Sequence, residues 1–360
     1  MARLGEYVRI RTGKLDANAS SPNGQYPYFT CAVEPLRIES YSYDCECVLV
    51  AGNGDLNVKY YCGKFDAYQR TYIIESLDKT ILSVPYLYCF LDKYVETLRQ
   101  QAIGGVIKYI KLGNLTEANI PIPSLDEQFS VVANVNKVNE LIALRKEQLA
   151  KLDQLVKSRF VEMFGDPKSN PFGFERLMLK DTCKVITGNT PSRAVSEYYG
   201  DFVEWIKTDN IVNGLLNPTK AAESLSEKGM EAGRTVESGS ILMACIAGSI
   251  ASIGRVCVTD RKVAFNQQIN AVVPEMYDIL FLYSLLQISK DYLVEDINMA
   301  LKGILSKSKL EEKEFIVPPM ELQKQFADFV KQVDKSKFDL KQSLEKLETL
   351  KKSLMQQYFG

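Results

Sequence analysis

Two long stretches of the chain, 121–165 and 317–360, carry apolar residues at a heptad spacing and are expected to be helices. Each stretch opens after a proline-rich entry, runs without Gly or Pro, and ends at a glycine, the usual start and stop signals of a helix. The apolar heptad positions are Val135, Val138, Ile142, Leu149, Leu152 and Val156 in the first stretch and Val330, Val333, Leu340, Leu344, Leu347 and Leu354 in the second. Leu141, Leu155 and Leu350 widen this stripe from neighbouring positions. The pattern is typical of helices that pack on other helices, each roughly 55 Å long at 1.5 Å per residue.

The same sequence phrase closes both stretches. "LAKLDQLVKSRFVEMFG" ends at Gly165 and "LEKLETLKKSLMQQYFG" ends at Gly360, and upstream residues such as Gln128 and Gln323 match at a constant offset of 195. Two equal helices of one chain can cover each other's apolar stripes, so we expect them to pair. The alternative is that each helix packs in a homodimer.

The segments before the two helices also resemble each other. Thr12-Gly13 matches Thr187-Gly188, and "DAYQRTYII" stands where "AFNQQINAVV" stands in the second segment. Short β-branched and aromatic runs flank turn residues, including Asn53-Gly54, a strong hairpin signal. Helical patterns cover 84–101 and 277–297. The sequence therefore predicts a duplicated α+β chain, with mostly antiparallel sheets. Its expected domains are 1–120, the helix 121–165, 166–316 and the helix 317–360.

Composition excludes several classes of chemistry. The 360 residues include no His, and the eight Cys contain no CxxC pair, so neither a zinc site nor a His-dependent triad is expected. We expect free thiols in a reducing cytoplasm. No apolar stretch suits a signal peptide or a membrane span. The net charge of −1 predicts no basic field over the whole protein.

Motif searches find no catalytic site. The stretch "GNGDLN" lacks the third glycine of a dinucleotide fingerprint, no Walker motif occurs, and Glu311-Glu312-Lys313 is best explained as a solvated turn. We therefore assign no catalytic residue and no metal ligand.

Polar and aromatic side chains gather instead in the loops of both segments. Arg, Lys, Asn and Gln read base edges, while Ser, Thr and Tyr hold phosphates, so these loops are candidates for DNA contact. Taken singly, each of these residues is more often structural or merely solvated, because Asn and Gln clusters commonly satisfy turns; as a set in two matching segments they favour a duplex with two half-sites. The candidates in the first segment are Arg9, Arg11, Lys14, Lys59, Tyr61, Lys64, Tyr68, Gln69 and Arg70; those in the second are Asn189, Thr190, Ser192, Arg193, Lys207, Asn210, Ser249, Arg255, Asn266, Gln267 and Gln268.

The order of these segments and motifs along the chain resembles that of the specificity (S, HsdS) subunits of type I restriction-modification systems. The resemblance rests on "IPIPSLDEQ" opening a helix, "LAKLDQLVKSRFVEMFGDP" closing it, "TGNTPSR" and "EYYGDFVEWIKTDNI" in the second segment, and "VAFNQQINAVVPE" after them. It covers nearly the full length of the chain. It implies two pseudo-symmetric target recognition domains joined by two long antiparallel coiled-coil helices.

The resemblance also implies a function without catalysis by this chain. Each domain would read one half of a split site in double-stranded DNA, and the helices would set the gap between the halves. Two methyltransferase subunits would dock on the chain, and restriction subunits would join the complex; S-adenosylmethionine, ATP and Mg would belong to these partners. The alternatives are a single-chain modification or cleavage enzyme with a cryptic site, and a coiled-coil scaffold that binds only protein. Circular duplication would further place Gly360 near Met1.

Overall fold

The computed structural model describes residues 1–295, 297 and 303–360, and its contacts divide the chain into two compact units. The first unit combines Met1–Lys146 with Gln342–Gly360, and the second comprises Glu147–Lys341. The two long helices therefore contribute residues to both units. Asp296, the penultimate residue of the helical pattern predicted over 277–297, lies outside the described residues.

The first unit is built on a six-stranded sheet with the order β2-β7-β5-β6-β3-β4. All neighbours are antiparallel except β3 and β6, which are parallel. A two-stranded ladder of β1 and β8 lies beside it. The strands are β1 (Ala2–Arg3), β2 (Val8–Thr12), β3 (Tyr26–Phe29), β4 (Leu36–Ile38), β5 (Tyr43–Ala51), β6 (Val58–Ala67), β7 (Thr71–Ser76) and β8 (Asn119–Ile120), and the helices η1 (Leu4–Glu6), α1 (Val84–Gln101) and α2 (Leu112–Thr116).

The second unit holds a four-stranded sheet, β10-β19-β15-β17, and a five-stranded sheet, β11-β13-β12-β18-β14. Two further ladders pair β9 with β21 and β16 with β20. The strands are β9 (Glu175–Met178), β10 (Cys183–Thr187), β11 (Tyr199–Gly200), β12 (Val203–Ile206), β13 (Ser224–Leu225), β14 (Thr235–Val236), β15 (Ile241–Ala244), β16 (Ile246–Ala247), β17 (Val256–Val258), β18 (Val263–Phe265), β19 (Ile269–Pro274), β20 (Gly303–Ile304) and β21 (Glu314–Val317). Its short helices are α4 (Leu179–Thr182), η2 (Ser196–Tyr198), η3 (Thr208–Asn210), α5 (Glu227–Ala232), η4 (Ile250–Ser252), α6 (Ile279–Ile288), α7 (Lys290–Val294) and α8 (Lys307–Glu311).

The two units repeat one strand arrangement. β10, β19 and β15 correspond to β2, β7 and β5, and the parallel pair β12·β18 corresponds to β3·β6. The long strand β6 of the first unit is replaced in the second by two short strands, β17 and β18. This interruption is why one sheet in the first unit becomes two in the second, while the order of strands is kept.

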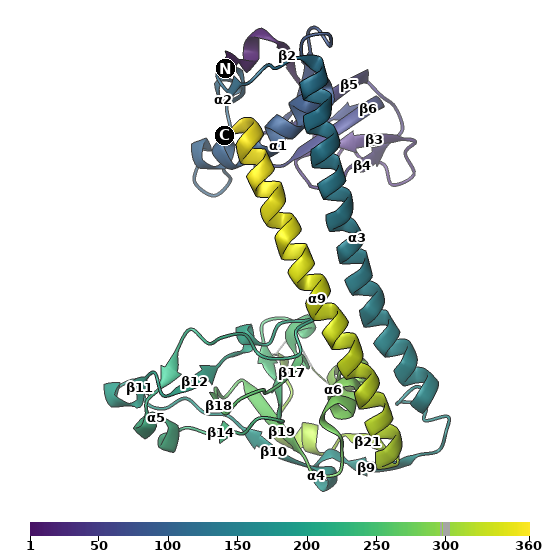
Figure 1. The fold of residues 1–360 in the computed structure, drawn as a ribbon, viewed down its shortest axis with the longest axis vertical. Coiled ribbons are helices and arrows are strands. Elements are labelled where there is room, and N and C mark those ends of the chain that lie inside the picture. Colours follow the sequence, from purple (N-terminus) through teal and green to yellow (C-terminus); the bar gives the residue numbers. More distant parts are fainter. Residues whose placement is uncertain (296, 298–302) are drawn as a thin grey trace. The chain divides into compact units, whose positions relative to one another are not determined.

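The long helices α3 (Leu125–Phe164) and α9 (Met320–Phe359) run antiparallel (Figure 1). Within the first unit, Asn134 Nδ2 donates to the Tyr358 hydroxyl at 3.1 Å, and Lys146 pairs with Glu348 at 3.4 Å. Within the second unit, Asp153 pairs with Lys337 at 2.7 Å. Residues farther along α3 thus meet residues farther back in α9, the register that antiparallel helices require.

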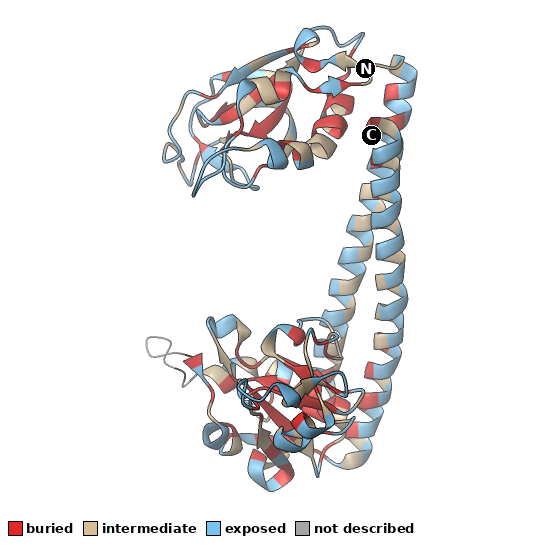
Figure 2. Ribbon diagram, turned by 90° about the vertical axis from the view of Figure 1, so that its left-hand side faces the viewer, coloured by how far each residue is buried: buried red, intermediate tan, exposed pale blue. Residues whose placement is uncertain are grey.

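The repeated phrase ends in two matching aromatic clusters. Phe164 packs edge-on against Phe281, with ring centroids 4.8 Å apart, in the second unit. Phe359 packs against Tyr86, with centroids 5.2 Å apart, in the first. Figure 2 shows the red, buried positions gathered inside each globular part, with exposed residues along much of the helices. The duplicated phenylalanines therefore anchor the end of each long helix to the globular part of one unit.

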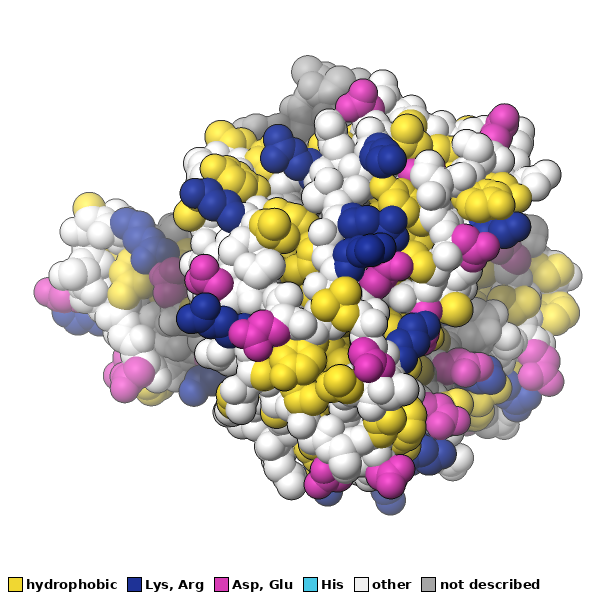
Figure 3. Space-filling view, turned by 90° about the horizontal axis from the view of Figure 1, so that it is seen from above, with side chains coloured by type: hydrophobic (Ala, Val, Ile, Leu, Met, Phe, Trp, Pro, Cys, Tyr) yellow, Lys and Arg dark blue, Asp and Glu magenta, His cyan; other side chains and the backbone are white. Residues whose placement is uncertain are grey.

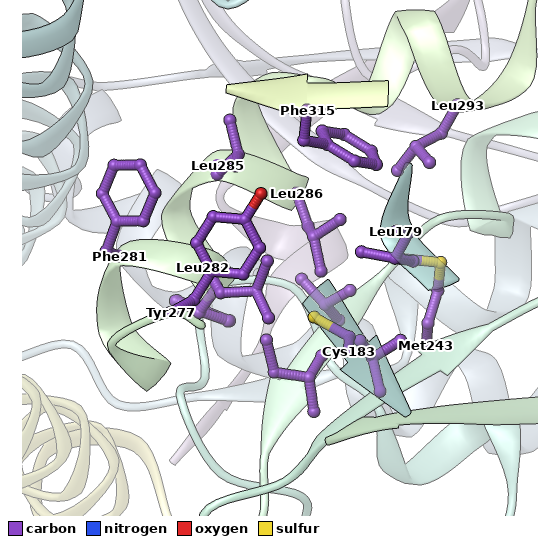
Figure 4. Packing of buried hydrophobic residues seen from close by; sticks show 14 of the residues in the cluster. Leu179, Cys183, Met243, Tyr277, Phe281, Leu282, Leu285, Leu286, Leu293 and Phe315 are labelled. Atoms are coloured by element: carbon purple, nitrogen blue, oxygen red, sulfur yellow. The ribbon is translucent and has the colours of Figure 1, made fainter. Parts of the chain in front are cut away.

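The core of the second unit is drawn in Figure 4. Leu282, Leu285 and Leu286 of α6 lie over Cys183 of β10 and Met243 of β15, and all five are buried. Apolar residues on one side of a helix and on one face of a sheet bury each other in this way.

The Gln that is repeated near the start of each long helix has a defined structural role. Gln128 accepts from Ser83 N at 2.9 Å and donates to Pro123 O at 3.0 Å. Gln323 repeats both bonds, accepting from Asp278 N at 2.9 Å and donating to Pro318 O at 2.8 Å. Each glutamine is buried and ties the proline-rich entry to the start of the shorter helix, α1 or α6, in its own unit.

Both ends of the chain lie in the first unit. The N and C labels are close together in Figures 1 and 2, and Leu4 and Phe359 belong to the same buried cluster. This agrees with the expectation that Gly360 lies near Met1. The predicted α+β class with two pseudo-symmetric domains and two antiparallel helices is confirmed; the predicted domain boundaries stay a prediction.

Candidate nucleic-acid interface

A loop pair in the first unit brings four candidate residues together. It consists of residues 13–16, which follow β2, and residues 67–70, which connect β6 to β7. Gly13 permits the contact, because a Cβ there would lie 2.1 Å from Ala67 O. Lys14 N donates to Ala67 O at 3.2 Å, and Gln69 N donates to Leu15 O at 2.9 Å. Lys14, Tyr68, Gln69 and Arg70 are therefore neighbours.

The second unit contains a loop pair of the same construction, 188–192 with 265–268. A Cβ on Gly188 would lie 2.2 Å from Asn266 O, and Asn189 N donates to Phe265 O at 3.1 Å. The Thr190 hydroxyl donates to Gln267 Oε1. The second loop pair thus presents its own candidate residues at the positions that the first loop pair occupies in the first unit. They are Asn189, Thr190, Ser192, Gln267 and Gln268, in place of Lys14, Tyr68, Gln69 and Arg70. The paired phrases beginning with Thr-Gly were the sequence signal for this arrangement.

A cluster of cations on aromatic rings lies beside the second loop pair. The Arg193 guanidinium lies 4.4 Å from the centre of the Tyr199 ring, and Lys207 Nζ lies 5.0 Å from the Trp205 ring. Trp205 Nε1 donates to Asn189 O at 3.3 Å, which connects this cluster to the loop pair. Cations held over rings keep a defined direction, which suits them to bind phosphates.

Glu223 joins the two cations of this cluster. Its Oε2 lies 2.6 Å from Arg193 Nη2, and its Oε1 accepts from Lys207 Nζ. The hydrogen bonds from Lys207 and then Arg193 lower the pKa of the Glu223 carboxyl. Glu223 and Trp205 were missed by sequence reasoning, because their spacing from Arg193 carries no motif; contact depends on the pairing of β12 with β13.

Other candidates of the first unit lie on strands. Arg11 pairs with Glu75 and lies 5.2 Å from the centre of the Tyr43 ring, while Arg9 is exposed on the same strand. Lys59 Nζ donates to Asn57, and burial lowers the pKa of Lys59. Lys64 lies over the ring of Tyr41. Tyr61 packs on Phe29, with ring centroids 5.0 Å apart. These residues are spread along the strands and are not gathered at the loop pair.

Several candidates of the second unit satisfy its own polar groups. Asn210 is buried and donates to Thr219 Oγ1, and Asn266 is buried and donates to Gln268 Oε1. Arg255 donates to Ser252 O and Thr208 O, and the Ser249 hydroxyl meets that of Ser252. The exposed members of the loop pair are better placed to meet a ligand. Whether any of these residues touches DNA stays a prediction.

The charge on the face drawn in Figure 3 is mixed. On the face in Figure 3, dark blue Lys and Arg side chains alternate with magenta acidic ones and yellow apolar ones, without a continuous basic area. This fits the net charge of −1. A ligand held by electrostatics would have to be bound by local groups such as Arg193 and Lys207.

Within residues 1–295, 297 and 303–360, no three His, Cys, Asp or Glu side chains are arranged to hold a metal ion. None of the helices in this described part combines the length and apolar character that a membrane crossing needs.

The residues predicted to pair the helices are all buried or half-buried. They are Val135, Val138, Ile142, Leu149, Leu152 and Val156 on α3, and Val330, Val333, Leu340, Leu344, Leu347 and Leu354 on α9. Two neighbours assigned to the same stripe, Leu155 and Leu350, are exposed. The difference arises because an α-helix drifts relative to a strict heptad, so flanking positions turn outward. Arg145 instead contributes a bond across the pair, from Nε to Ser343 Oγ at 3.2 Å.

Comparison with known proteins gives matches over both units. The type I restriction enzyme EcoDI specificity subunit of Escherichia coli is 38% identical over 154 residues, which is 43% of this chain and 34% of that subunit. The HindI specificity subunit of Haemophilus influenzae is 34% identical over 107 residues, which is 29% of this chain and 22% of that subunit. The aligned parts thus span about a third or less of those relatives.

Two solved structures share the fold over almost the whole chain. The S subunit of the type I restriction-modification system from M. genitalium has a TM-score of 0.64 at 16% identity, covering 100% of this chain and 95% of that one. A chain from work on complex assembly and conformational transition of the type I R-M system has a TM-score of 0.60 at 18% identity, covering 99% and 96%. Residues 1–154 and 171–352 match the family described as type I restriction modification DNA specificity domain. The chain therefore belongs to this family.

Proposed function

We propose that this chain recognises a two-part DNA site as the specificity subunit of a type I restriction-modification complex. The proposal rests on one observation: each unit contains a loop pair of the same construction. Both are held by a glycine in backbone contact, Gly13 and Gly188, yet they present different side chains. One scaffold with two sets of reading residues suits a DNA site whose halves differ in sequence, because protein pseudo-symmetry matches a divided site.

The side chains at the loop pairs support base reading. In the first unit, Gln69 Nε2 donates to Asp16 Oδ1 at 3.0 Å, and Arg70 is exposed beside it. In the second, Gln267 is exposed and held by Thr190. Gln and Arg make bidentate bonds to adenine and guanine edges. Neighbouring bonds that fix an amide or a guanidinium before DNA arrives reduce the entropy cost of binding.

The long helices support a spacing role in this proposal. Each contains 40 residues and is anchored by a buried glutamine near its start and a buried phenylalanine at its end. At 1.5 Å per residue such a helix spans about 60 Å, more than one turn of DNA at about 34–36 Å. The helices would set the number of unread base pairs between the two halves.

Catalysis and its cofactors would reside on partners. Two methyltransferase subunits would dock on the chain and supply S-adenosylmethionine chemistry, and restriction subunits would supply ATP- and Mg-dependent cleavage. The chain itself would be non-catalytic and act in the cytoplasm, where the DNA is. The relatives named as specificity subunits support this division of labour.

Selection from a pool of randomised duplexes tests the proposal. The chain, assembled with methyltransferase partners, should enrich a two-part motif with a fixed gap. Replacement of Gln267 by Ala should then relax one half of the motif only, by roughly 1–3 kcal/mol if the base contact is direct. Relaxation of both halves would contradict the assignment of one unit to one half. Methylation or cleavage of DNA by the purified chain alone would show that it is an enzyme.

A further inference from the structure

An apolar hairpin projects from the first unit just after α1. It spans Ile103–Tyr109 and is closed by two backbone bonds, Ile103 N to Tyr109 O at 3.0 Å and Tyr109 N to Ile103 O at 2.8 Å. At its tip, Val106 is fully exposed and Ile107 is 61% exposed. Hairpin tips usually carry polar turn residues, and contiguous exposed apolar residues mark binding sites.

Backbone hydrogen bonds connect this hairpin to the first loop pair. Gly52 N donates to Arg70 O at 2.8 Å, and Ile110 N donates to Gly52 O at 2.9 Å. Gly54 N also donates to Lys108 O at 2.9 Å. The hairpin is therefore held one strand away from the turn that carries Arg70, and a ligand on the loop pair would lie next to it.

The charges around the hairpin suit a polyanion. Between Thr97 and Thr116 the chain contains three cations and no Asp or Glu. Arg99 pairs with Asp55 at 3.4 Å, so Lys108 and Lys111 are the cations that can meet a polyanion. Lys108 and Lys111 are both exposed. An apolar tip next to exposed cations suits a contact in which an apolar side chain enters between stacked base faces and the cations meet nearby phosphates.

The attachment of the hairpin is repeated in the second unit. Cys245 N donates to Gln268 O at 2.8 Å, and Leu305 N donates to Cys245 O at 2.8 Å. These bonds correspond to those of Gly52 with Arg70 and Ile110. Both units therefore keep the same backbone hydrogen bonds next to the turn of the loop pair, which carries Arg70 in the first unit and Gln268 in the second. This repetition indicates a shared role at the loop pair.

We propose that Val106 and Ile107 form a wedge that enters the groove of double-stranded DNA beside the bases met by the first loop pair. This inference rests on the proposed DNA-recognition function and adds a contact by shape to it. Proteins that insert apolar side chains between base steps unstack the step and bend the duplex, which lets more of the protein surface touch DNA. Lys108 and Lys111, which follow the wedge in the chain, bind neighbouring phosphates.

Base-stacking fluorescence tests the wedge. The complex of the chain with its methyltransferase partners is bound to its selected duplex, in which 2-aminopurine replaces single adenines along the first half-site. We expect fluorescence to rise at one step on binding. The double variant V106S/I107S should lose that rise and bind roughly tenfold to a hundredfold more weakly, the range expected when one to two apolar side chains lose their burial.

The control is Leu77→Ser, in the same unit and with a matched exposure of 60%. This variant should keep both the fluorescence rise and the affinity. Unchanged fluorescence and affinity in V106S/I107S would overturn the wedge. Loss of a partner subunit from the double variant, with DNA contacts unchanged, would also overturn it and identify a protein-docking hairpin. If the wild-type complex enriches no duplex at all, the proposed function fails together with the wedge.

Discussion

Replacing Glu223 by Gln tests the cation cluster of the second unit. Glu223 holds Arg193 at 2.6 Å and also binds Lys207, so its charge competes with any phosphate for both cations. Gln keeps the size of the side chain and removes the charge. We therefore expect E223Q to bind DNA more tightly at low salt and to lose part of its sequence discrimination, because phosphate contacts carry no base information.

The size of the effect follows from the number of cations released. Each phosphate neutralised steepens the plot of log affinity against log salt by about 0.9, so two freed cations steepen it by up to about 1.8. Between about 50 and 200 mM salt this corresponds to roughly a tenfold larger loss of affinity than in the wild type.

Tryptophan fluorescence can report DNA binding at this cluster. Trp205 is its single tryptophan, and Lys207 lies 5.0 Å from the ring. Fluorescence titrations of the selected duplex at several salt concentrations give the slope directly. Glu237→Gln is the control, because Glu237 pairs with Lys262 at 2.9 Å away from the aromatic rings. An unchanged slope in E223Q, or weaker binding at every salt concentration, would refute the competition between Glu223 and phosphate.

The pH dependence has a defined sign. The pKa of Glu223 is lowered from its ordinary 4.5, mainly by Lys207, so the carboxylate is ionised at neutral pH. The stabilisation that the ionised Glu223 carboxylate contributes is fully present above the pKa of this group in the unfolded chain. It is lost as the pH falls through the lower pKa of the group in the folded protein. Wild-type and E223Q salt slopes should therefore differ from pH 6 to 8 and converge only in acid, well below about 4.5.

Three other predictions concern the anchors and the helices. Gln128→Leu should destabilise the protein by about 2–4 kcal/mol, since it leaves Ser83 N and Pro123 O without their partner, as urea unfolding would show; an unchanged midpoint would contradict the anchoring role. Phe359→Ala should cost about 3–5 kcal/mol through the cavity it leaves, whereas Phe338→Ala, at a 61% exposed site on the same helix, should cost little. Matched seven-residue insertions in both long helices lengthen them by about 10.5 Å, so the selected gap should grow by about three base pairs while both half-site sequences stay the same.

The duplication made much of this fold predictable. The heptad stripe and the offset of 195 indicated two equal helices, and the matching Thr-Gly phrases indicated that the segments before them are repeated. Local patterns and repeats of this kind can be recognised in the sequence itself, because each feature occurs twice in the chain. The interruption of β6 into β17 and β18 was not predictable, because it depends on how the second unit closes its sheets.

Individual site residues were harder to predict. Asn210 and Asn266 have the chemistry of base-reading residues, yet they are buried and bonded to their own unit. Glu223 lacked any motif but joins Arg193 and Lys207. Side-chain type is visible in the sequence, whereas burial and contacts across strands come from tertiary packing.

The most direct test of the account is a selection from randomised duplexes, carried out in parallel for the wild type and for a chain whose second loop pair is exchanged. The exchange replaces residues 188–192 and 265–268 with those of a related specificity subunit. The account predicts that one half of the enriched motif changes while the other half and the gap remain. Enrichment of a motif altered in both halves, or of no two-part motif by the wild-type complex, would contradict it.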